Sequence, residues 1–148
     1  QSIYSLSERT VELEVLPACR AYGLGLICWS PLRSGMLAGV LRREREGRRA
    51  EGRRPLEPWM EELIVKRRPA LEAWESLCLE MGEQPADVAL AWLLHQPGVT
   101  GPIIGPRTLA HLQGSLRALE LKLAPDVLAR LDSIWPGPGG AAPEAYAW

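Results

Sequence analysis

The sequence predicts an α/β protein in which strands and helices alternate along a parallel sheet. Three short apolar segments, each bounded by glycine or polar residues, are separated by stretches with helical periodicity. This alternation is typical of βα units. The length of 148 residues and the ordinary globular composition predict one compact domain.

The first strand is expected at residues 1–5, and a helix follows it. Ser5 and Glu8 have the spacing of a capping box, in which a hydroxyl and a carboxylate bind the free N–H groups of a helix start. Apolar residues then recur at helical spacing. Because Pro17 lacks an N–H group and its ring crowds the preceding turn, we expect this helix to break or kink near Leu16.

The second strand is expected at residues 25–29, where GLICW is a continuous apolar run between a glycine and a Ser-Pro pair. Such a run predicts a strand that is buried on both faces, as parallel sheets usually require. Cys28 and Trp29 point to opposite faces of an alternating strand, and we expect Cys28 to lie in the core.

A long irregular segment is expected at residues 33–68. Its centre, RREREGRRAEGRRP, contains seven arginines between Arg42 and Arg54. One interpretation is a solvated loop, because a run of like charges seldom packs. The other is a lid that folds over an anionic ligand. The sequence does not decide between a solvated loop and a lid.

The remainder of the chain predicts four helices and one more strand. Trp74 and Trp92 lie on apolar helix stripes and are expected in the core. The expected elements are helices at 69–81 and 85–96, a strand at 101–105 (GPIIG), helices at 109–119 and 125–134, and an irregular Pro/Gly-rich tail at 136–148.

The composition argues against several functions. With 17 Lys and Arg against 18 Asp and Glu, the formal net charge is −1, which is unsuited to a nucleic-acid binder. The longest apolar run, residues 88–94, is too short to cross a membrane. Three cysteines without metal-type spacing favour a reducing, cytoplasmic location and no metal site.

The chain starts at Gln1, without an initiator methionine and directly in a strand-like run. An open three-stranded parallel sheet would leave two sheet edges uncovered. We therefore expect the chain to be a segment of a larger protein.

Two loops that follow strands combine small residues with hydrogen-bond donors. They are residues 29–37 (WSPLRSGML) and residues 105–108 (GPRT). Ligands of parallel α/β proteins bind at the carboxyl ends of strands, where such loops meet. Glycine, arginine and threonine at a helix start can bind phosphate through backbone amides, the helix dipole and the guanidinium. The same four residues could equally form a simple turn.

Two long strings resemble a known family. QSIYSLSERTVELEVLPACRAYGLGLICWSPLRSGMLAG and VALAWLLHQPGVTGPIIGPRTLAHL are similar to the later half of the aldo-keto reductases, in the branch with bacterial reductases and potassium-channel β subunits. The resemblance implies a (β/α)8 TIM barrel that binds NADPH or NADP+ at the carboxyl ends of its strands. Residues 1–135 would form the C-terminal part of that barrel, with its last three βα units, followed by the tail at 136–148.

The resemblance also implies which residues contact the cofactor. Gln1 would hydrogen-bond the nicotinamide carboxamide, and the nicotinamide ring would stack on Trp29. Gly105 and Arg107 would hold the 2′-phosphate and ribose, and an arginine there favours NADPH over NADH. The pyrophosphate would lie along a loop formed by Ser30, Pro31, Leu32, Ser34, Gly35 and Leu37.

The chain departs from the family pattern at the adenine end. The family usually has glutamine, an often acidic residue and asparagine where this chain has His111, Gly114 and Ser115. His111 could pair with the phosphate or stack on adenine, or it could simply face solvent. Cofactor preference therefore depends on positions where the chain is unusual.

The family's catalytic Asp, Tyr, Lys and His lie upstream of the matched segment, so no catalytic residue is assigned to this chain. Its tyrosines and lysines do not occupy the matching places, and His95 is expected to end a helix. The first hypothesis is the cofactor-binding part of an NADPH-dependent reductase of small carbonyl substrates, completed by an N-terminal half-barrel. The alternative is a non-catalytic half-barrel that senses nucleotides or pairs with itself.

Overall fold

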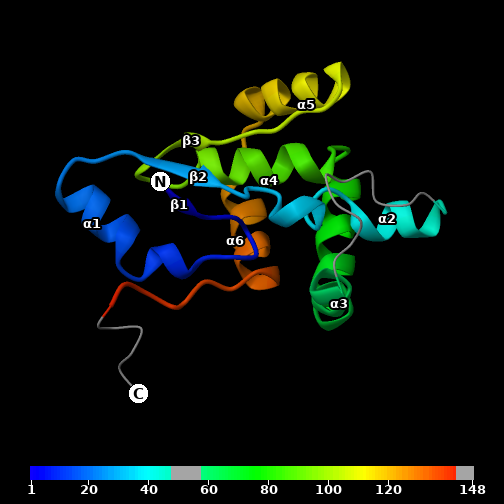
Figure 1. Cartoon of the computed structure of the whole chain (residues 1–148), viewed down its shortest axis with the longest axis horizontal. Helices are drawn as coiled ribbons and strands as arrows, with labels where there is room; N and C mark the ends of the chain where they lie inside the picture. Colours follow the sequence, from blue (N-terminus) through cyan, green and yellow to red (C-terminus); the bar gives the residue numbers. More distant parts are fainter. Residues whose placement is uncertain (48–57, 143–148) are drawn as a thin grey trace.

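The computed structural model describes residues 1–47 and 58–142, which form a three-stranded parallel sheet with helices around it (Figure 1). The strands are β1 (Ser2–Ile3), β2 (Leu26–Trp29) and β3 (Val99–Pro102), in the order β1-β2-β3. The predicted alternation of strands and helices on a parallel sheet is confirmed. The helices are η1 (Thr10–Glu12), α1 (Val15–Ala21), η2 (Arg33–Gly35), α2 (Val40–Arg45), α3 (Pro58–Glu80), α4 (Pro85–Leu94), α5 (Leu109–Glu120) and α6 (Pro125–Ile134).

The sheet is covered on one face. Leu26 and Cys28 of β2 are buried on the covered side, and α4 packs against β3 (Figure 1). Ile27 and Trp29 point to the other side and are 46% and 43% exposed. The expectation that β2 is buried on both faces is therefore wrong for the described residues, because these residues supply a packing layer on one side only.

The segment between β1 and β2 begins differently from the predicted capping box. Ser5 and Glu8 are joined through their backbones, with each N–H donating to the other's carbonyl oxygen at 3.0 and 3.1 Å. Helical structure breaks at Leu13 and Glu14, between η1 and α1, and α1 then runs through Leu16 and Pro17, so the break expected near Leu16 is wrong in position. Pro17 is the third residue of α1, where the N–H group it lacks would have no partner inside the helix.

Residues 33–68 are more regular than predicted. They contain η2, α2 and the first part of α3, which continues through Pro69 instead of starting there. The buried residues Met60, Ile64 and Leu71 lie on one continuous side of α3, and their packing offsets the hydrogen bond that proline removes. Residues 48–57, which hold much of the arginine-rich centre, lie outside the described residues.

The C-terminal elements follow the predicted order with one shift. β3 lies at Val99–Pro102, two to three residues before the expected strand, and Ile103 and Ile104 follow it with exposed side chains. Helices α4, α5 and α6 lie close to their predicted bounds. Residues 136–142 of the tail form no helix or strand, and the Ala142 N–H donates to the Leu13 carbonyl at 2.8 Å.

The core lies between the covered face of the sheet and the helices. The predictions for Cys28, Trp74 and Trp92 are confirmed, since these side chains are at most 1% exposed. Tyr4 packs edge-on against Trp92, with ring centroids 5.4 Å apart. Within the described part of the chain, no helix is long and apolar enough to cross a membrane.

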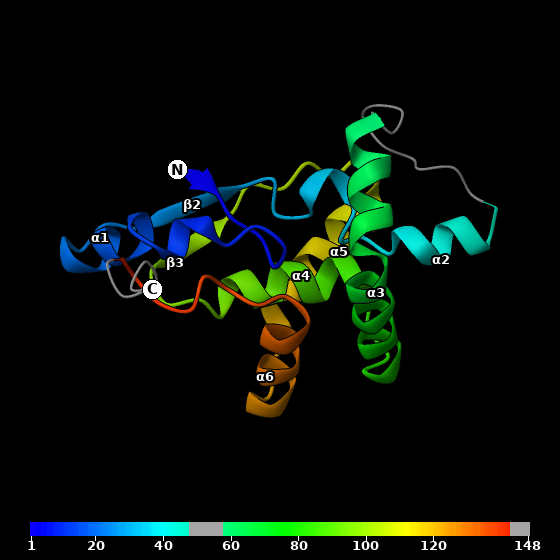
Figure 2. The same cartoon turned by 90° about the horizontal axis from the view of Figure 1, so that it is seen from below.

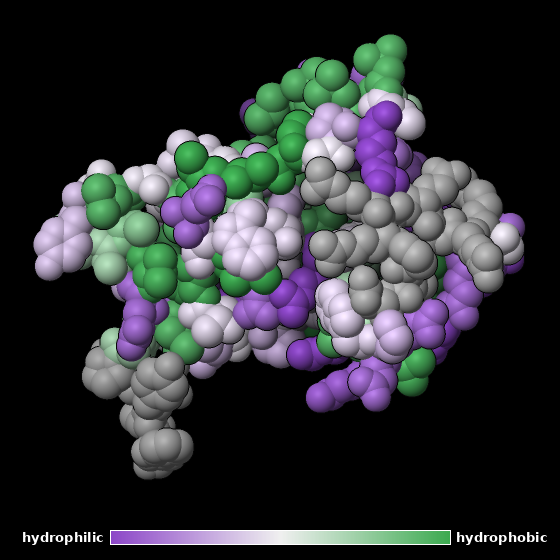
Figure 3. Space-filling model, in the orientation of Figure 1, coloured by the Kyte–Doolittle hydropathy of each residue, from purple (hydrophilic) through white to green (hydrophobic). Residues whose placement is uncertain are grey.

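Helix α5 packs on α4 through small residues. Ala118 is buried, and a Cβ atom on Gly114 would lie 2.7 Å from the Asp87 Oδ1 of α4. The leucines of α5 are exposed on its opposite side, and Figure 3 shows hydrophobic side chains gathered over this helix and along β3. Gly114 therefore faces α4 in this structure.

We expect Gly114→Ala to lower the free energy of unfolding by about 1 kcal/mol. Alanine normally stabilises a helix interior by about 1 kcal/mol relative to glycine, but here the new methyl group would displace the buried Asp87 carboxylate. Urea unfolding would measure the change. The same substitution in an Asp87→Ala background removes the clash and should be stabilising. If Gly114→Ala alone stabilises the protein, the close approach of Asp87 does not oppose a methyl group at position 114.

Candidate cofactor site

Trp29 and Gln1 lie at neighbouring strands of the sheet. Trp29 is the last residue of β2 and pairs with Ile3 of β1. Gln1 directly precedes β1, and if the alternation of the strand extends to it, its side chain lies on the same side as Ile3 and Trp29. Both Gln1 and Trp29 are exposed. With that alternation, an amide and an indole lie on one accessible surface.

The turn after β2 has an unusual backbone. Ser30, Arg33 and Ser34 have φ angles of 53°, 47° and 54°, and Gly35 has 93°. Left-handed conformations of this kind cost non-glycine residues about 1 kcal/mol or more each, and they gather at functional sites. Successive backbone N–H groups in such turns also form concave surfaces that bind anions.

Hydrogen bonds hold this turn in its conformation. The Leu32 carbonyl accepts from the N–H groups of Gly35 and Leu37, at 2.9 and 3.2 Å. The Leu37 carbonyl in turn accepts from the Trp74 Nε1 of α3 at 3.3 Å. Pro31 and Leu37 are buried, and both backbone groups of Leu37 have partners, so the structure does not bear out the expected contact of Leu37 with a ligand.

The loop after β3 leaves the sheet at the same edge. The Ile103 N–H donates to the Cys28 carbonyl at 2.7 Å, and β2 and β3 are parallel, so both loops emerge from carboxyl ends of strands (Figures 1 and 2). Gly105 and Arg107 are exposed, and a Cβ atom on Gly105 would have no neighbour within 4 Å. This is the edge where ligands of parallel α/β proteins bind.

Helix α5 begins as the GPRT pattern suggests. Thr108 is its N-cap, and the Thr108 Oγ1 accepts from the His111 N–H at 3.2 Å. His111 is exposed in the first turn. The Ser115 hydroxyl donates to the His111 carbonyl at 2.9 Å, within the helix. The exposed Arg107 side chain thus lies next to a helix N-terminus, where an anion is favoured.

Tyr4 and His95 have structural partners. The Tyr4 hydroxyl donates to Glu12 at 2.7 Å, and burial, followed by that carboxylate, raises the pKa of Tyr4 far above its usual value. His95 ends α4, where its Nε2 accepts from the Leu123 N–H at 3.2 Å. The residues that the structure describes contain no group of three or more His, Cys, Asp or Glu side chains able to hold a metal ion.

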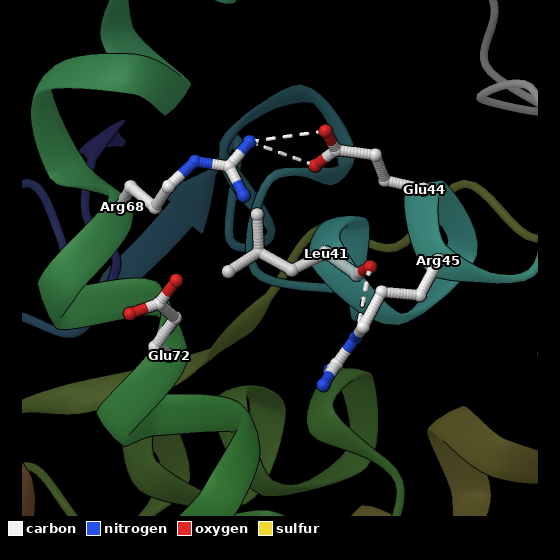
Figure 4. A pocket seen from close by; sticks show the side chains of 5 residues that line it. All are labelled: Leu41, Glu44, Arg45, Arg68 and Glu72. Atoms are coloured by element: carbon white, nitrogen blue, oxygen red, sulfur yellow. Dashed lines mark hydrogen bonds and ion pairs between the residues drawn. The ribbon is translucent and has the colours of Figure 1, made fainter.

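A separate open cavity of about 300 Å³ lies between α2 and α3 (Figure 4). An ion pair crosses it, in which the Arg68 Nη2 lies 2.9 Å from the Glu44 Oε2. The residues that line it are Leu41, Glu44, Arg45, Arg68 and Glu72, so it contains none of the expected cofactor contacts. Sequence reasoning missed this cavity because it predicts an irregular segment at residues 33–68, where α2 and the first part of α3 lie.

The family model for the aldo/keto reductase family matches residues 1–136. The chain belongs to this family. The membership that the two long strings suggested is therefore confirmed.

This aldo/keto reductase chain is similar to an uncharacterized oxidoreductase, YrpG, from Bacillus subtilis strain 168. The two are 49% identical over 148 residues, which cover all of the chain and 43% of the relative. The chain thus spans less than half the length of this curated relative.

The fold is also similar to the crystal structure of a thermostable aldo-keto reductase, Tm1743, determined with the inhibitor epalrestat. The TM-score is 0.60 at 24% identity, and the match covers 90% of this chain and 38% of the crystal structure's chain. At this identity, the similarity supports the α/β fold.

Proposed function

We propose that this chain is the cofactor-binding C-terminal part of an NADPH-dependent aldo/keto reductase that reduces aldehydes or ketones. The observation that carries the proposal is the accessible Trp29 at the end of β2, followed directly by the left-handed turn at Ser30–Gly35. In a family member, a flat aromatic face beside an anion-binding turn suits a nicotinamide ring that is joined to a pyrophosphate.

The groups present fit a dinucleotide. The indole offers a ring surface, and the exposed Gln1, directly before β1, has an amide that can both donate and accept. The turn offers an ordered backbone, in which the N–H groups of Arg33 and Gly35 already donate to carbonyl oxygens of the turn. Arg107 beside the start of α5 offers a guanidinium and a helix N-terminus for a second phosphate.

Each group has a specific task in this proposal. Trp29 holds the nicotinamide ring, Gln1 fixes the ring's carboxamide, and the Ser30–Gly35 turn holds the pyrophosphate. Arg107 binds the 2′-phosphate, which is the group that distinguishes NADPH from NADH. NADPH supplies the hydride when it is bound, and the protein supplies orientation.

The remaining parts of the reaction lie outside the described residues. We propose that the proton donor and its catalytic partners belong to the N-terminal half of a TIM barrel, as the family pattern implies. That half would also cover the exposed Ile27 on the open sheet face, whereas Trp29 would stay accessible to the nicotinamide. The complete enzyme would act in the cytoplasm on a small carbonyl compound.

A second candidate function is a non-catalytic module that binds the nucleotide and pairs with another half-barrel. The exposed apolar side chains of the sheet face favour it, because such a surface is usually covered. Size-exclusion chromatography of the 148-residue chain separates the candidates. A stable dimer favours the module, whereas a monomer that gains reductase activity with an N-terminal half-barrel favours the enzyme.

Calorimetric titration with NADPH and NADH tests the proposed function. We expect Trp29→Ala to weaken binding of both nucleotides about tenfold, since it removes the stacking surface. Arg107→Ala should weaken NADPH about tenfold and NADH less than about twofold. The controls are Trp59→Ala and Arg130→Ala, which remove an exposed indole and an exposed guanidinium elsewhere.

Two results would count against this assignment. Unchanged affinity in Trp29→Ala would remove the nicotinamide role. Equal losses of NADPH and NADH in Arg107→Ala would remove the 2′-phosphate role.

A further inference from the structure

Arg43 of α2 reaches back to the turn that follows β2. Its Nη2 donates to the Gly35 carbonyl oxygen at 3.0 Å. Gly35 has a φ of 93° and ends the left-handed part of the turn. The same carbonyl accepts from the Ala38 N–H at 3.1 Å, so a side chain eight residues away adds a second donor to one peptide group of the turn.

Helix α2, which carries Arg43, is itself fixed to α3. The carboxylate of Glu75 accepts the N–H groups of Leu41 and Arg42, both at 2.8 Å. Gly39, the N-cap of α2, has no side chain to satisfy these groups, so Glu75 does so from the neighbouring helix. This anchoring gives Arg43 a defined position relative to the turn.

The other arginines near the turn have different partners. The Arg42 guanidinium donates to the Gln84 side chain at 2.8 Å, and Arg45 pairs with Glu75 at 3.3 Å. Arg33, which lies within the turn, pairs with Glu8 at 3.4 Å. Arg43 is thus the arginine of α2 that is hydrogen-bonded to the turn.

We propose that Arg43 is a positioning residue for the pyrophosphate of the cofactor. This inference rests on the proposed function. By binding the Gly35 carbonyl, the guanidinium holds that peptide group in one orientation and offsets the partial negative charge of its oxygen. The N–H groups of Arg33, Gly35, Met36 and Leu37 donate within the turn, so the anion would meet a backbone that is already fixed, and binding need not first order the loop.

Affinities of the 148-residue chain for two nucleotides test the role. The ligands are NADPH and 2′,5′-ADP, which lacks the pyrophosphate and the nicotinamide. We expect Arg43→Met to weaken NADPH about tenfold and 2′,5′-ADP less than about twofold. Arg43→Lys keeps a charged donor and should recover part of the loss. The matched control, Arg42→Met, removes the neighbouring charge and should leave both affinities within about twofold.

Amide hydrogen exchange without nucleotide tests the contact itself. We expect residues 33–37 to exchange at least about fivefold faster in Arg43→Met than in the wild type or Arg42→Met, because the turn loses an anchor. Unchanged exchange overturns the inference, and so do equal losses of NADPH and 2′,5′-ADP. If residues 33–37 exchange faster in Arg43→Met but the wild-type chain binds no NADPH, the result counts against the proposed function alone. The anchoring role of Arg43 is then still supported.

Discussion

Replacing Arg9 with methionine is expected to lower the free energy of unfolding by about 3 kcal/mol. The Arg9 side chain is 13% exposed, and its guanidinium contacts several groups. Its Nε donates to Glu12 at 2.6 Å, and its Nη1 donates to Asp132 and to the Trp135 carbonyl. It also lies 5.0 Å from the centre of the Trp92 ring.

The large effect follows from what the substitution would leave behind. Without Arg9, Glu12 would keep the hydrogen bond from the Tyr4 hydroxyl but lose those from the guanidinium. The Glu12 side chain is 19% exposed. A partly buried charge that loses its counter-charge costs more than the pair contributes. Because Arg9 joins the segment after β1 to the end of α6, the loss would also loosen both ends of the described chain.

Urea unfolding of matched variants separates these contributions. Methionine keeps an apolar side chain of similar length but removes the guanidinium above Trp92, so the change reports on the polar partners and the cation–π contact together. Tyr4→Phe removes one hydrogen bond to Glu12 and should cost about 1 kcal/mol. Arg67→Met, on the exposed side of α3, is the control and should change stability by less than about 0.5 kcal/mol. If Arg9→Met lowers the free energy of unfolding by less than about 1 kcal/mol, the contacts of the Arg9 guanidinium are not a major source of stability.

Local sequence pattern predicts most elements of the fold, because burial follows periodicity. The stripe in α4 and the Pro at the start of α6 give helix bounds close to those observed. The pattern fails for β3, where the apolar pair Ile103 and Ile104 suggests a strand but follows it. Strand bounds depend on the register with β2, which is a property of two segments and not of one.

The same distinction explains the long segment after β2. Pro69 is a strong local signal for a helix start, but the buried side of α3 begins earlier, at Met60. Tertiary packing of that side outweighs the local preference of one proline. The charged residues of α2 suggest a solvated loop, whereas the helix is stabilised by Glu75, more than thirty residues further along the chain.

The candidate site was predictable in its position but not in its backbone. Loops after strands indicate the edge of the sheet, and the resemblance supplies roles for Trp29 and Arg107. Nothing in the residue types of Ser30, Arg33 and Ser34 predicts left-handed conformations, since these types rarely adopt them. The contacts that hold the turn, from Trp74 and Arg43, join separate elements and have no local signal.

Replacing Glu75 with alanine is expected to lower the free energy of unfolding by about 3 kcal/mol and to unwind α2. The carboxylate is 6% exposed and accepts the N–H groups of Leu41 and Arg42. Bonds from backbone N–H groups to a charged acceptor are about twice as strong as neutral ones. Without this acceptor, the Leu41 N–H would be left without its partner in a buried position.

Two further variants show whether the capping interaction causes the loss. Glu75→Gln keeps the shape but replaces one acceptor oxygen with an NH2 group, and should cost about 2 kcal/mol. Glu72→Ala, one turn earlier on α3, removes an exposed carboxylate and should change stability by less than about 0.5 kcal/mol. Hydrogen exchange should become faster at residues 41–45 in Glu75→Ala only. If exchange there stays slow while stability falls, Glu75 stabilises α3 packing and does not cap α2.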